Sequence, residues 1–441
     1  MLTRRETLLT GTALLAACAT GAGPGRRPSA QPDYVTREGT QLRLAGRPYR
    51  FAGSNMWYAA WLGAGDPARL TKELDALAAM GVTNLRIAAS AELSPLKNSA
   101  RPTFRDQSRN YSETLLKGLD RALAEMGRRN IRGVLYLTNF WEWSGGMMTY
   151  HYWTNGGRYI DMNDPAHPWP EFPDMVSNFY ASPEAVAMYH DYVRAVVTRT
   201  NSITGVPYAD DPAIMAWQLA NEPRPAGSEK VARERMDDFL KWVRGTAGLI
   251  KSLDSNHLVS TGSEGLQGCL GDESCVLAEH GMDEIDYLTT HIWPLNWSWV
   301  ESADLPGTWA GGEAKVRDYM AKHVALATRL GKPVVFEEFG FPRDKGLFDP
   351  GTPTTYKDRF YQLIYDQVLA SARTGGPLVG SNFWAWNGSG RASHPDHRFV
   401  RGDPHFLGDP PHEPQGWYGV FDVDASTRAV IAAHARALAA V

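Results

Sequence analysis

The fold is decided by a run in the middle of the chain that reads Ile214-Met215-Ala216-Trp217-Gln218-Leu219-Ala220 and then stops at Asn221-Glu222-Pro223. A continuous apolar run of this length is typical of a parallel strand buried on both faces. A second run, Val334-Val335-Phe336, stops in the same way at Glu337-Glu338-Phe339-Gly340. Polar residues at the carboxyl end of a buried strand predict an active site in an α/β fold.

Six further apolar runs resemble these two, and amphipathic stretches separate them. The eight expected strands are 49–53, 82–88, 132–138, 213–220, 257–260, 285–290, 333–338 and 378–384. Apolar residues recur with helical spacing over 236–250 and 356–368. Ser182-Pro183 indicates the start of another helix, and a last helix is expected over 429–440. This alternation predicts a (β/α)8 TIM barrel that forms a single catalytic domain over residues 34–441.

A doubly wound parallel sheet is the alternative fold. Such a sheet usually carries a glycine-rich phosphate loop after its first strand. The corresponding segment here reads Gly53-Ser54-Asn55-Met56-Trp57-Tyr58, which is rich in aromatic rather than glycine residues. The barrel is therefore the preferred prediction.

The composition favours a ring-bearing ligand such as a carbohydrate. The 441 residues include 15 Trp, 18 Tyr and 15 Phe, whose flat faces can stack on a sugar. Basic and acidic residues nearly balance, at 45 and 49, so nothing suggests the cationic surface that nucleic acid requires. We expect no nucleic-acid partner and a monomer.

The N-terminus has the features of an export signal. Arg4-Arg5 precedes a short apolar run, and Leu15-Ala16-Ala17-Cys18 resembles a bacterial lipobox. The run is shorter than the about 20 residues that a membrane-spanning helix needs. We therefore expect a signal peptide over 1–17, a lipidated Cys18, and a flexible tether over 18–33. The product would be a periplasmic or outer-membrane lipoprotein, or a secreted protein, attached to a membrane only through its lipid.

The other two cysteines are Cys269 and Cys275. In an oxidising compartment outside the cytoplasm we expect them to form a disulfide. A loop this short would stabilise the protein by roughly 2 kcal/mol, enough to fix one loop.

Glu222 and Glu338 follow the fourth and seventh strands, which lie across a barrel from one another. Two facing carboxylates are what glycoside hydrolysis needs, one as proton donor and one as nucleophile or base. Strict alternation along the seventh strand would place Val334, Phe336 and Glu338 on one face and Glu337 on the other. This pattern predicts that Glu338 points into the barrel mouth.

These motifs, Trp217 to Pro223 and Phe336 to Gly340, resemble glycoside hydrolase family 5. The stretches Thr261-Gly262-Ser263-Glu264-Gly265 and His291-Ile292-Trp293-Pro294-Leu295-Asn296-Trp297 resemble its β-mannan-degrading subfamily. The resemblance implies a retaining enzyme without a cofactor. Glu222 would be the acid/base and Glu338 the nucleophile.

The resemblance also implies a set of substrate-binding residues. Asn221 would bind the 2-hydroxyl group of the sugar, and Arg86 would keep the nucleophile ionised. His291 would lie beside the acid/base. Trp384 would form the floor of the −1 subsite, which holds the sugar that the nucleophile attacks. The family commonly has a tyrosine where this chain has Trp293, and an indole N–H donates but cannot accept a hydrogen bond. Trp293 is therefore expected to bind sugar rather than act in catalysis. The remaining expected binding residues are Trp141, Asn55, Trp57 and Glu264.

Two long segments at strand ends are expected to wall the cleft. The first, 141–180, is rich in aromatic residues, of which Trp141 is expected to face sugar. The second, 387–415, contains His394, His397, His405 and His412, but their irregular spacing does not favour a zinc site, so no metal is expected.

The expected substrate is β-mannan, glucomannan or galactomannan. Endo-β-1,4-mannanase is the first hypothesis, because this activity is the commoner one among members of the family. Exo-β-mannosidase is the second, because the two loops could block one end of the cleft. A β-1,4-glucanase remains open, as does transglycosylation. A non-catalytic carbohydrate-binding protein would need neither Glu222 nor Glu338, and their joint presence argues against it.

Overall fold

The computed structural model describes residues 34–403 and 406–441. The predicted signal peptide, Cys18 and the tether lie outside the described residues. The centre of the molecule is an eight-stranded parallel sheet, which confirms the barrel prediction. Its strands are β4 (Phe51–Asn55), β5 (Asn84–Ala88), β6 (Arg132–Tyr136), β7 (Ile214–Gln218), β8 (Leu258–Ser260), β9 (Leu288–Ile292), β10 (Val334–Phe339) and β11 (Leu378–Phe383).

The strands follow one another around the barrel in the order β8-β7-β6-β5-β4-β11-β10-β9. Each neighbouring pair in this order is parallel, as in β4 with β5 and β10 with β11. Between β8 and β9 the backbone N–H of Asp286 donates to the carbonyl of Val259 at 2.7 Å, which links the two ends of the sheet. The carboxyl ends of all eight strands therefore meet at one mouth.

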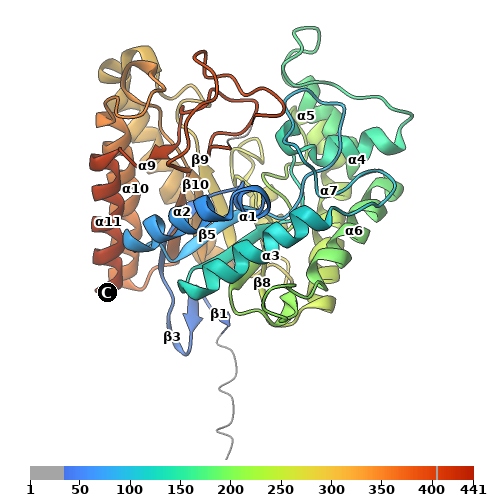
Figure 1. The fold of residues 1–441 in the computed structure, drawn as a ribbon, viewed down its shortest axis with the longest axis horizontal. Coiled ribbons are helices and arrows are strands. Elements are labelled where there is room, and N and C mark those ends of the chain that lie inside the picture. Colours follow the sequence, from blue (N-terminus) through green and yellow to red (C-terminus); the bar gives the residue numbers. More distant parts are fainter. Residues whose placement is uncertain (1–33, 404–405) are drawn as a thin grey trace, which may run out of the picture. The chain divides into compact units, whose positions relative to one another are not determined.

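Helices surround the strands, and Figure 1 shows them outside the central sheet. They are α1 (Ala59–Gly65), α2 (Pro67–Ala79), α3 (Glu113–Arg128), α4 (Gly146–Thr154), α5 (Glu171–Val176), α6 (Pro183–Val197), α7 (Glu229–Leu253), α8 (Glu273–His280), α9 (Leu305–Leu330), α10 (Thr355–Thr374) and α11 (Ala425–Ala439). As predicted, Ser182 caps α6 by accepting the backbone N–H of Ala185, and Pro183 occupies the first turn. None of the described helices is both long and apolar enough to cross a membrane.

The boundaries of some strands differ from the predicted ones for a physical reason. The first strand begins at Phe51 rather than at residue 49, because the backbone N–H of Tyr49 donates instead to the carbonyl of Leu42 at 2.8 Å, outside the barrel sheet. The sixth strand extends to Ile292 and includes His291, a polar residue that the apolar pattern excluded. Polar side chains are buried inside this barrel, so its strands run beyond their apolar segments.

Three short strands lie at the amino end of the described chain, namely β1 (Val35–Glu38), β2 (Gln41–Leu44) and β3 (Arg47–Pro48). Apolar residues from β1 and β2 join Val134, Met215 and Val335 of the barrel strands in one buried cluster. In Figure 1 this small sheet lies at the lower end of the barrel. It covers the apolar interior at the end opposite the mouth.

Long connections rise at the mouth. One runs from β6 to α6 and contains α4 and α5, and the other follows β11, with β12 (Trp386–Gly388) paired to β13 (Val420–Phe421). Figure 1 shows both at the upper end of the barrel. The predicted disulfide between Cys269 and Cys275 is present, with Cα atoms 5.9 Å apart, and joins the segment after β8 to α8.

Candidate active site

A cavity of about 590 Å³ lies at the barrel mouth. Seven of the sequence-predicted residues line it, namely Trp141, Asn221, Glu222, Glu264, Trp293, Glu338 and Trp384. Both predicted wall segments also contribute to it, the first through Trp169 and the second through Glu413. The structure therefore brings the predicted site together in one place.

Glu222 lies four residues beyond β7, in a left-handed backbone conformation with φ of 51°. Its backbone N–H donates to the carbonyl of Gly262 at 2.9 Å, which holds this conformation in place. A positive φ at a residue other than glycine is unusual and is found mainly where surrounding contacts impose it, as at active sites. The side chain of Glu222 is buried and directed into the cavity.

Glu338 also reaches the mouth, but the alternation argument for it is wrong. Val334 and Phe336 pack in the outer core against the helices, whereas Val335 belongs to the inner cluster. The pairing of β10 with β9 shifts register between Phe336 and Glu338. Such an irregularity lets Glu337 point into the barrel interior and the next residue, Glu338, point into the cavity.

Glu337 occupies the layer below the cavity. Its carboxylate accepts hydrogen bonds from Gln218 Nε2 at 2.5 and 2.6 Å and from the hydroxyl of Tyr287 at 3.2 Å. Burial raises its pKa, and the cation of Arg86 opposes that rise. Glu337 is therefore a buried, fully partnered carboxyl group rather than a surface one.

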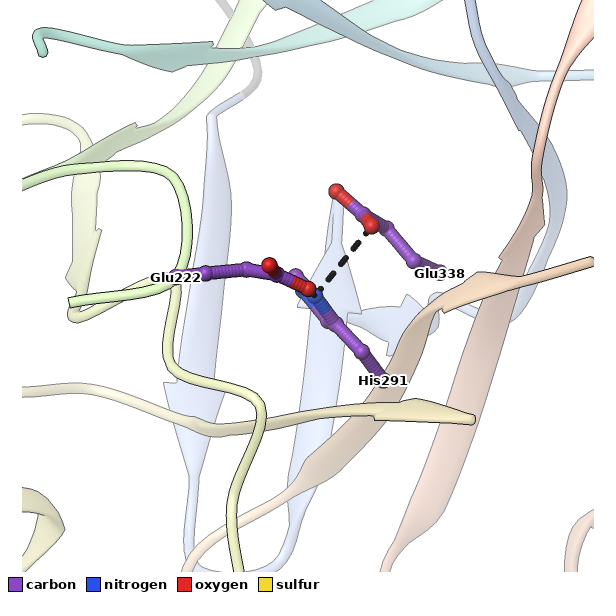
Figure 2. Close-up of side chains that lie close together, drawn as sticks. All are labelled: Glu222, His291 and Glu338. Atoms are coloured by element: carbon purple, nitrogen blue, oxygen red, sulfur yellow. Dashed lines mark hydrogen bonds and ion pairs between the residues drawn. The ribbon is translucent and has the colours of Figure 1, made fainter. Parts of the chain in front are cut away.

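His291 lies between the two glutamates, as Figure 2 shows. Its Nδ1 atom is 2.6 Å from Glu222 Oε1 and 3.3 Å from Glu338 Oε2. One side-chain atom from each of the three residues falls within 4.8 Å of the other two. Burial lowers the pKa of His291 to about 4, so the ring is neutral at neutral pH.

Arg86, on β5, is buried beneath the cavity and donates hydrogen bonds to four side chains. Its Nη1 forms an ion pair with Glu338, Nη2 donates to Asn221 Oδ1 at 2.8 Å, and Nε donates to Gln218 Oε1 at 2.7 Å. Nη1 also lies 3.3 Å from Asn55 Oδ1. A buried guanidinium needs such partners, and these four hold Glu338 and Asn221 in fixed positions.

The two carboxyl groups influence each other's protonation. Burial and the charge of Glu222 raise the pKa of Glu338, whereas Arg86 lowers it. Hydrogen bonds from His291 and from Trp141 Nε1 lower the pKa of Glu222 against its burial. These hydrogen bonds favour an anion on Glu222, while the ion pair favours one on Glu338. The ion pair between Arg86 and Glu338 is the stronger of the two influences, because Arg86 keeps its charge at any pH of interest, whereas His291 is neutral.

Four of the predicted binding residues do not line the cavity, namely Arg86, His291, Asn55 and Trp57. Arg86 and His291 contact the two glutamates, as described above. Asn55 is buried, donates to the carbonyl of Glu337 at 2.8 Å and accepts from Arg86, so it supports the site from below. Trp57 is buried against Trp143 and Phe406, and its Nε1 donates to the carbonyl of Gly408 at 3.0 Å. The prediction that Trp57 binds sugar is therefore wrong, because its ring belongs to the core beneath the second wall segment.

Aromatic side chains form much of the cavity wall. Trp384, which follows β11, meets Trp293 edge to face at 5.9 Å and Trp143 at 6.4 Å. Trp141 touches Glu222 through its indole N–H and stacks on Trp169 with ring centroids 6.3 Å apart. Aromatic side chains of this kind are suited to contact the apolar faces of sugar rings.

Several cavity residues were not predicted from the sequence. Arg224 forms an ion pair with Glu264, and its guanidinium lies 4.7 Å from the centroid of Trp141. Its position two residues after Glu222 was a signal that could have identified it. Glu413 offered no such signal, because it lies in an irregular loop far from any strand end.

The histidines of the second wall segment that the structure describes do not gather into one site. His394 pairs with Asp403 at 2.9 Å and His397 pairs with Asp349 at 3.3 Å, while His412 lines the cavity. His405 lies outside the described residues. The expectation that this segment walls the cleft is confirmed by Pro410, His412 and Glu413, which line the cavity.

Comparison with known proteins identifies related chains. A family model described as "GH family 5 beta-mannosidase-like", where GH stands for glycoside hydrolase, matches residues 32–441. A mannan endo-1,4-β-mannosidase 4 from Oryza sativa subsp. japonica is 32% identical over 375 residues, which are 79% of this chain and 72% of that protein. A second relative, mannan endo-1,4-β-mannosidase 1 from Arabidopsis thaliana, is 30% identical over 80% of this chain and 81% of its own length.

Among solved structures, the glycoside hydrolase family 5 mannosidase from Rhizomucor miehei superimposes with a TM-score of 0.84. It is 33% identical, and the match covers 93% of this chain and 98% of that one. The endo-1,4-β-mannanase from the same organism gives a TM-score of 0.66 at 22% identity, over 92% of this chain and 100% of that one, which shows a shared fold.

The contact between Arg86 and Glu338 leads to a prediction about pH dependence. Arg86 lowers the pKa of Glu338, so the Arg86→Met variant should need a higher pH to ionise this carboxyl group. The acidic limb of the kcat/KM profile on an aryl β-mannoside should move upward by about 1 to 3 pH units. Arg86→Lys keeps the cation and should move the limb less. If the acidic limb of a folded Arg86→Met variant does not move, Arg86 does not keep Glu338 ionised.

Proposed function

This chain belongs to glycoside hydrolase family 5 and is a glycosidase of the mannanase and mannosidase kind, and we propose that it releases mannose from the non-reducing ends of β-1,4-linked manno-oligosaccharides. We further propose a double displacement that retains the anomeric configuration. The observation that carries the mechanism is the short separation of carboxylate oxygens of Glu222 and Glu338, within 4.8 Å. Carboxyl groups about 5 Å apart suit retention, whereas inverting enzymes leave room for a water between them.

In the first step, Glu338 attacks the anomeric carbon of the −1 mannose. The bond between that carbon and the glycosidic oxygen breaks as Glu222 gives its proton to the oxygen, and the leaving sugar departs with a hydroxyl group. In the second step, Glu222 takes a proton from water, the water oxygen bonds to the anomeric carbon, and Glu338 leaves as a carboxylate. The two glutamates end in their starting states.

The neighbouring residues prepare the glutamates for these roles. Arg86 favours the anion of Glu338, so the proton shared by the pair is assigned to Glu222. The neutral ring of His291, 2.6 Å from Glu222, can hydrogen-bond to either protonation state of that carboxyl group. Asn221 is held by Arg86 at the rim of the cavity, where its amide can meet a sugar hydroxyl.

Attack at a chain end is supported by the position of the second wall segment. This segment follows β11, which lies beside β4 and β10, on the side of the barrel across from β7 and Glu222. Because Glu222 protonates the leaving group, the opposite side receives the non-reducing part of the substrate. Pro410, His412 and Glu413 of this segment line the cavity, and we infer that they close its non-reducing side.

The wall is held rigidly by Asp409. Its carboxylate accepts the backbone N–H groups of Gly416 at 2.9 Å and Tyr418 at 2.6 Å, and the side-chain amide of Asn387 at 3.1 Å. The buried ammonium of Lys357 donates to the carbonyl of Tyr418 at 2.9 Å. Burial and nearby carboxylates raise the pKa of Glu413 well above its usual range, so this side chain can meet a terminal sugar hydroxyl without adding a full charge.

Endo-β-1,4-mannanase is the second candidate. The plant relatives carry that name, and several side chains line the cavity on the side of Glu222, including Gln267, Trp297 and Trp169. A leaving group of several sugars would fit either mode of attack. The two modes of attack differ in how many sugars can bind beyond Trp384, on the non-reducing side of the cleaved bond.

The early products from mannohexaose should distinguish these modes. For an enzyme that removes chain ends, mannose and mannopentaose should be the first products. The reason is that the second wall segment would leave room for one sugar on the non-reducing side of the cleaved bond. Chromatography of a reducing-end-labelled substrate at low conversion measures this directly. A first mixture of mannobiose, mannotriose and mannotetraose would favour the endo-acting candidate.

The role of Glu222 predicts a dependence on the leaving group. Glu222→Gln cannot donate a proton, so cleavage of mannobiose should fall by about 100- to 10,000-fold. Dinitrophenolate leaves without a proton, so the first step on dinitrophenyl β-mannoside should stay near the wild-type rate in single-turnover measurements. Glu338→Gln, as the matched control, should lose both reactions. Equal losses on the two substrates in Glu222→Gln would exclude the acid/base role.

We also propose that the chain is an exported lipoprotein anchored through Cys18. The disulfide between Cys269 and Cys275 is consistent with an oxidising compartment outside the cytoplasm.

The Cys18 proposal predicts how the full chain divides between membrane and soluble fractions. The wild-type protein should sediment with membranes, and Cys18→Ser should be released, because the lipid supplies the anchor. Immunoblots of the two fractions measure this. Equal sedimentation of both forms would argue against lipidation.

A further inference from the structure

Glu337 is a buried carboxyl group that takes no part in the two chemical steps proposed above. It directly precedes Glu338 on β10, and only 1% of it is exposed. A carboxylate removed from water is stable only if charged or hydrogen-bonding partners replace the solvent. The role of this group can therefore be inferred from its partners.

The polar contacts of Glu337 favour its ionised form. Gln218 Nε2 donates hydrogen bonds to both carboxylate oxygens, at 2.5 and 2.6 Å, and the hydroxyl of Tyr287 donates to Oε1 at 3.2 Å. Arg86 Nε lies 3.7 Å from Oε2. Donors and a cation stabilise a carboxylate, so they oppose the rise in the pKa of Glu337 that burial causes. Glu337 is therefore a second anion beside Arg86.

Gln218 connects Glu337 with the guanidinium of Arg86. Its Oε1 accepts a hydrogen bond from Arg86 Nε at 2.7 Å, while its Nε2 is bound to Glu337. An amide has one acceptor and one donor end, so a carboxylate at Nε2 directs Oε1 toward the guanidinium. The ion pair with Glu338 is made by a different nitrogen of the same group, Nη1. One cation therefore serves two carboxylates.

We propose that Glu337 is a positioning residue of the active site, which orients Arg86 through Gln218 and shares the positive charge of Arg86 with Glu338. An anion on Glu337 repels a second anion and takes up part of the attraction of the cation. Glu338 is therefore more basic, and a stronger nucleophile, than it would be with Arg86 to itself. This proposal rests on the proposed double displacement, in which Glu338 is the nucleophile.

Other titratable groups also face these three charges. They are Tyr136 on β6, Glu222 beyond β7, Tyr287 before β9, His291 on β9 and Glu413 in the second wall segment. Burial lowers the pKa of His291 to about 4 and raises the pKa of both tyrosines well above its usual range, so these rings are neutral in weakly acidic solution. Glu222 holds the proton of the catalytic pair, and burial raises the pKa of Glu413. The charges that act on Glu338 as it ionises are thus those of Arg86 and Glu337.

The test is the pH profile of the Glu337→Gln variant, which loses the charge but keeps the shape of the side chain. Without the competing anion, Arg86 stabilises ionised Glu338 more strongly. The acidic limb of kcat/KM on dinitrophenyl β-mannoside should therefore move downward by about 1 pH unit. This substrate needs no proton from Glu222 in the first step, so the limb reports the ionisation of Glu338. The expected direction is opposite to that for Arg86→Met.

Asp120→Asn is the matched control for losing a buried carboxylate. Asp120, on α3, is buried and accepts hydrogen bonds from the hydroxyl of Tyr208 at 2.6 Å and from Arg199 Nε at 2.9 Å. Its partners are therefore of the same kinds as those of Glu337, but it does not line the cavity. Asp120→Asn should lower the melting temperature and leave the acidic limb where the wild type has it.

A purely structural role of Glu337 would lower stability or kcat and leave the acidic limb in place. A limb that stays in place, or moves upward, in Glu337→Gln would overturn the proposal. If this variant does not fold, the exchange of the two side chains, Glu337→Gln with Gln218→Glu, decides. It keeps one carboxylate and one amide beside Arg86, so its limb should lie at or above that of the wild type, and a lower limb would contradict the shared charge.

A failure of the underlying function gives a different result. Wild-type protein that does not hydrolyse dinitrophenyl β-mannoside would refute the proposed hydrolysis, and the role of Glu337 with it. An active enzyme whose limb moves in Arg86→Met but not in Glu337→Gln would keep the hydrolysis and refute only the role of Glu337.

Discussion

The site depends on one buried cation, the guanidinium of Arg86. It contacts Glu338 from β10, Gln218 from β7, Asn221 just beyond β7 and Asn55 from β4. A charge removed from water is stable only if it is paired and hydrogen-bonded, so the barrel must bring these partners together. The same contacts that stabilise the cation therefore fix the position of the proposed nucleophile.

A second consequence of the buried cation is that two adjacent glutamates take different places. Glu338 faces Arg86 in the cavity, while Glu337 lies below it, 3.7 Å from Arg86 Nε and bonded to Gln218 and Tyr287. The register shift between β9 and β10 allows both carboxyl groups to share one cation. The barrel interior beneath the cavity therefore has two layers. The upper layer is polar and contains Arg86, Gln218 and Glu337, and the lower layer is apolar.

Selectivity depends on elements outside the barrel. The segment containing Trp141 and Trp169 extends the surface next to Glu222, and the loop held by Asp409 presents Glu413 on the other side. Outside α4, α5 and the short pair of β12 with β13, side-chain hydrogen bonds and aromatic stacking hold these two segments. Loops of this kind vary freely on a rigid barrel, so substrate length can change while the reaction stays the same.

The amino-acid sequence by itself determined the eight strands, four of the helices and the meeting of Glu222 and Glu338 at one mouth, because these follow from apolar periodicity and from where each apolar run ends. The tertiary structure decided that Glu338 enters the cavity through a register shift rather than through strict alternation, that Trp57 is a core residue, and that Glu413 belongs to the site. A register shift, the burial of a tryptophan and the path of a long loop all depend on contacts between residues far apart in the chain. No local pattern contains those contacts.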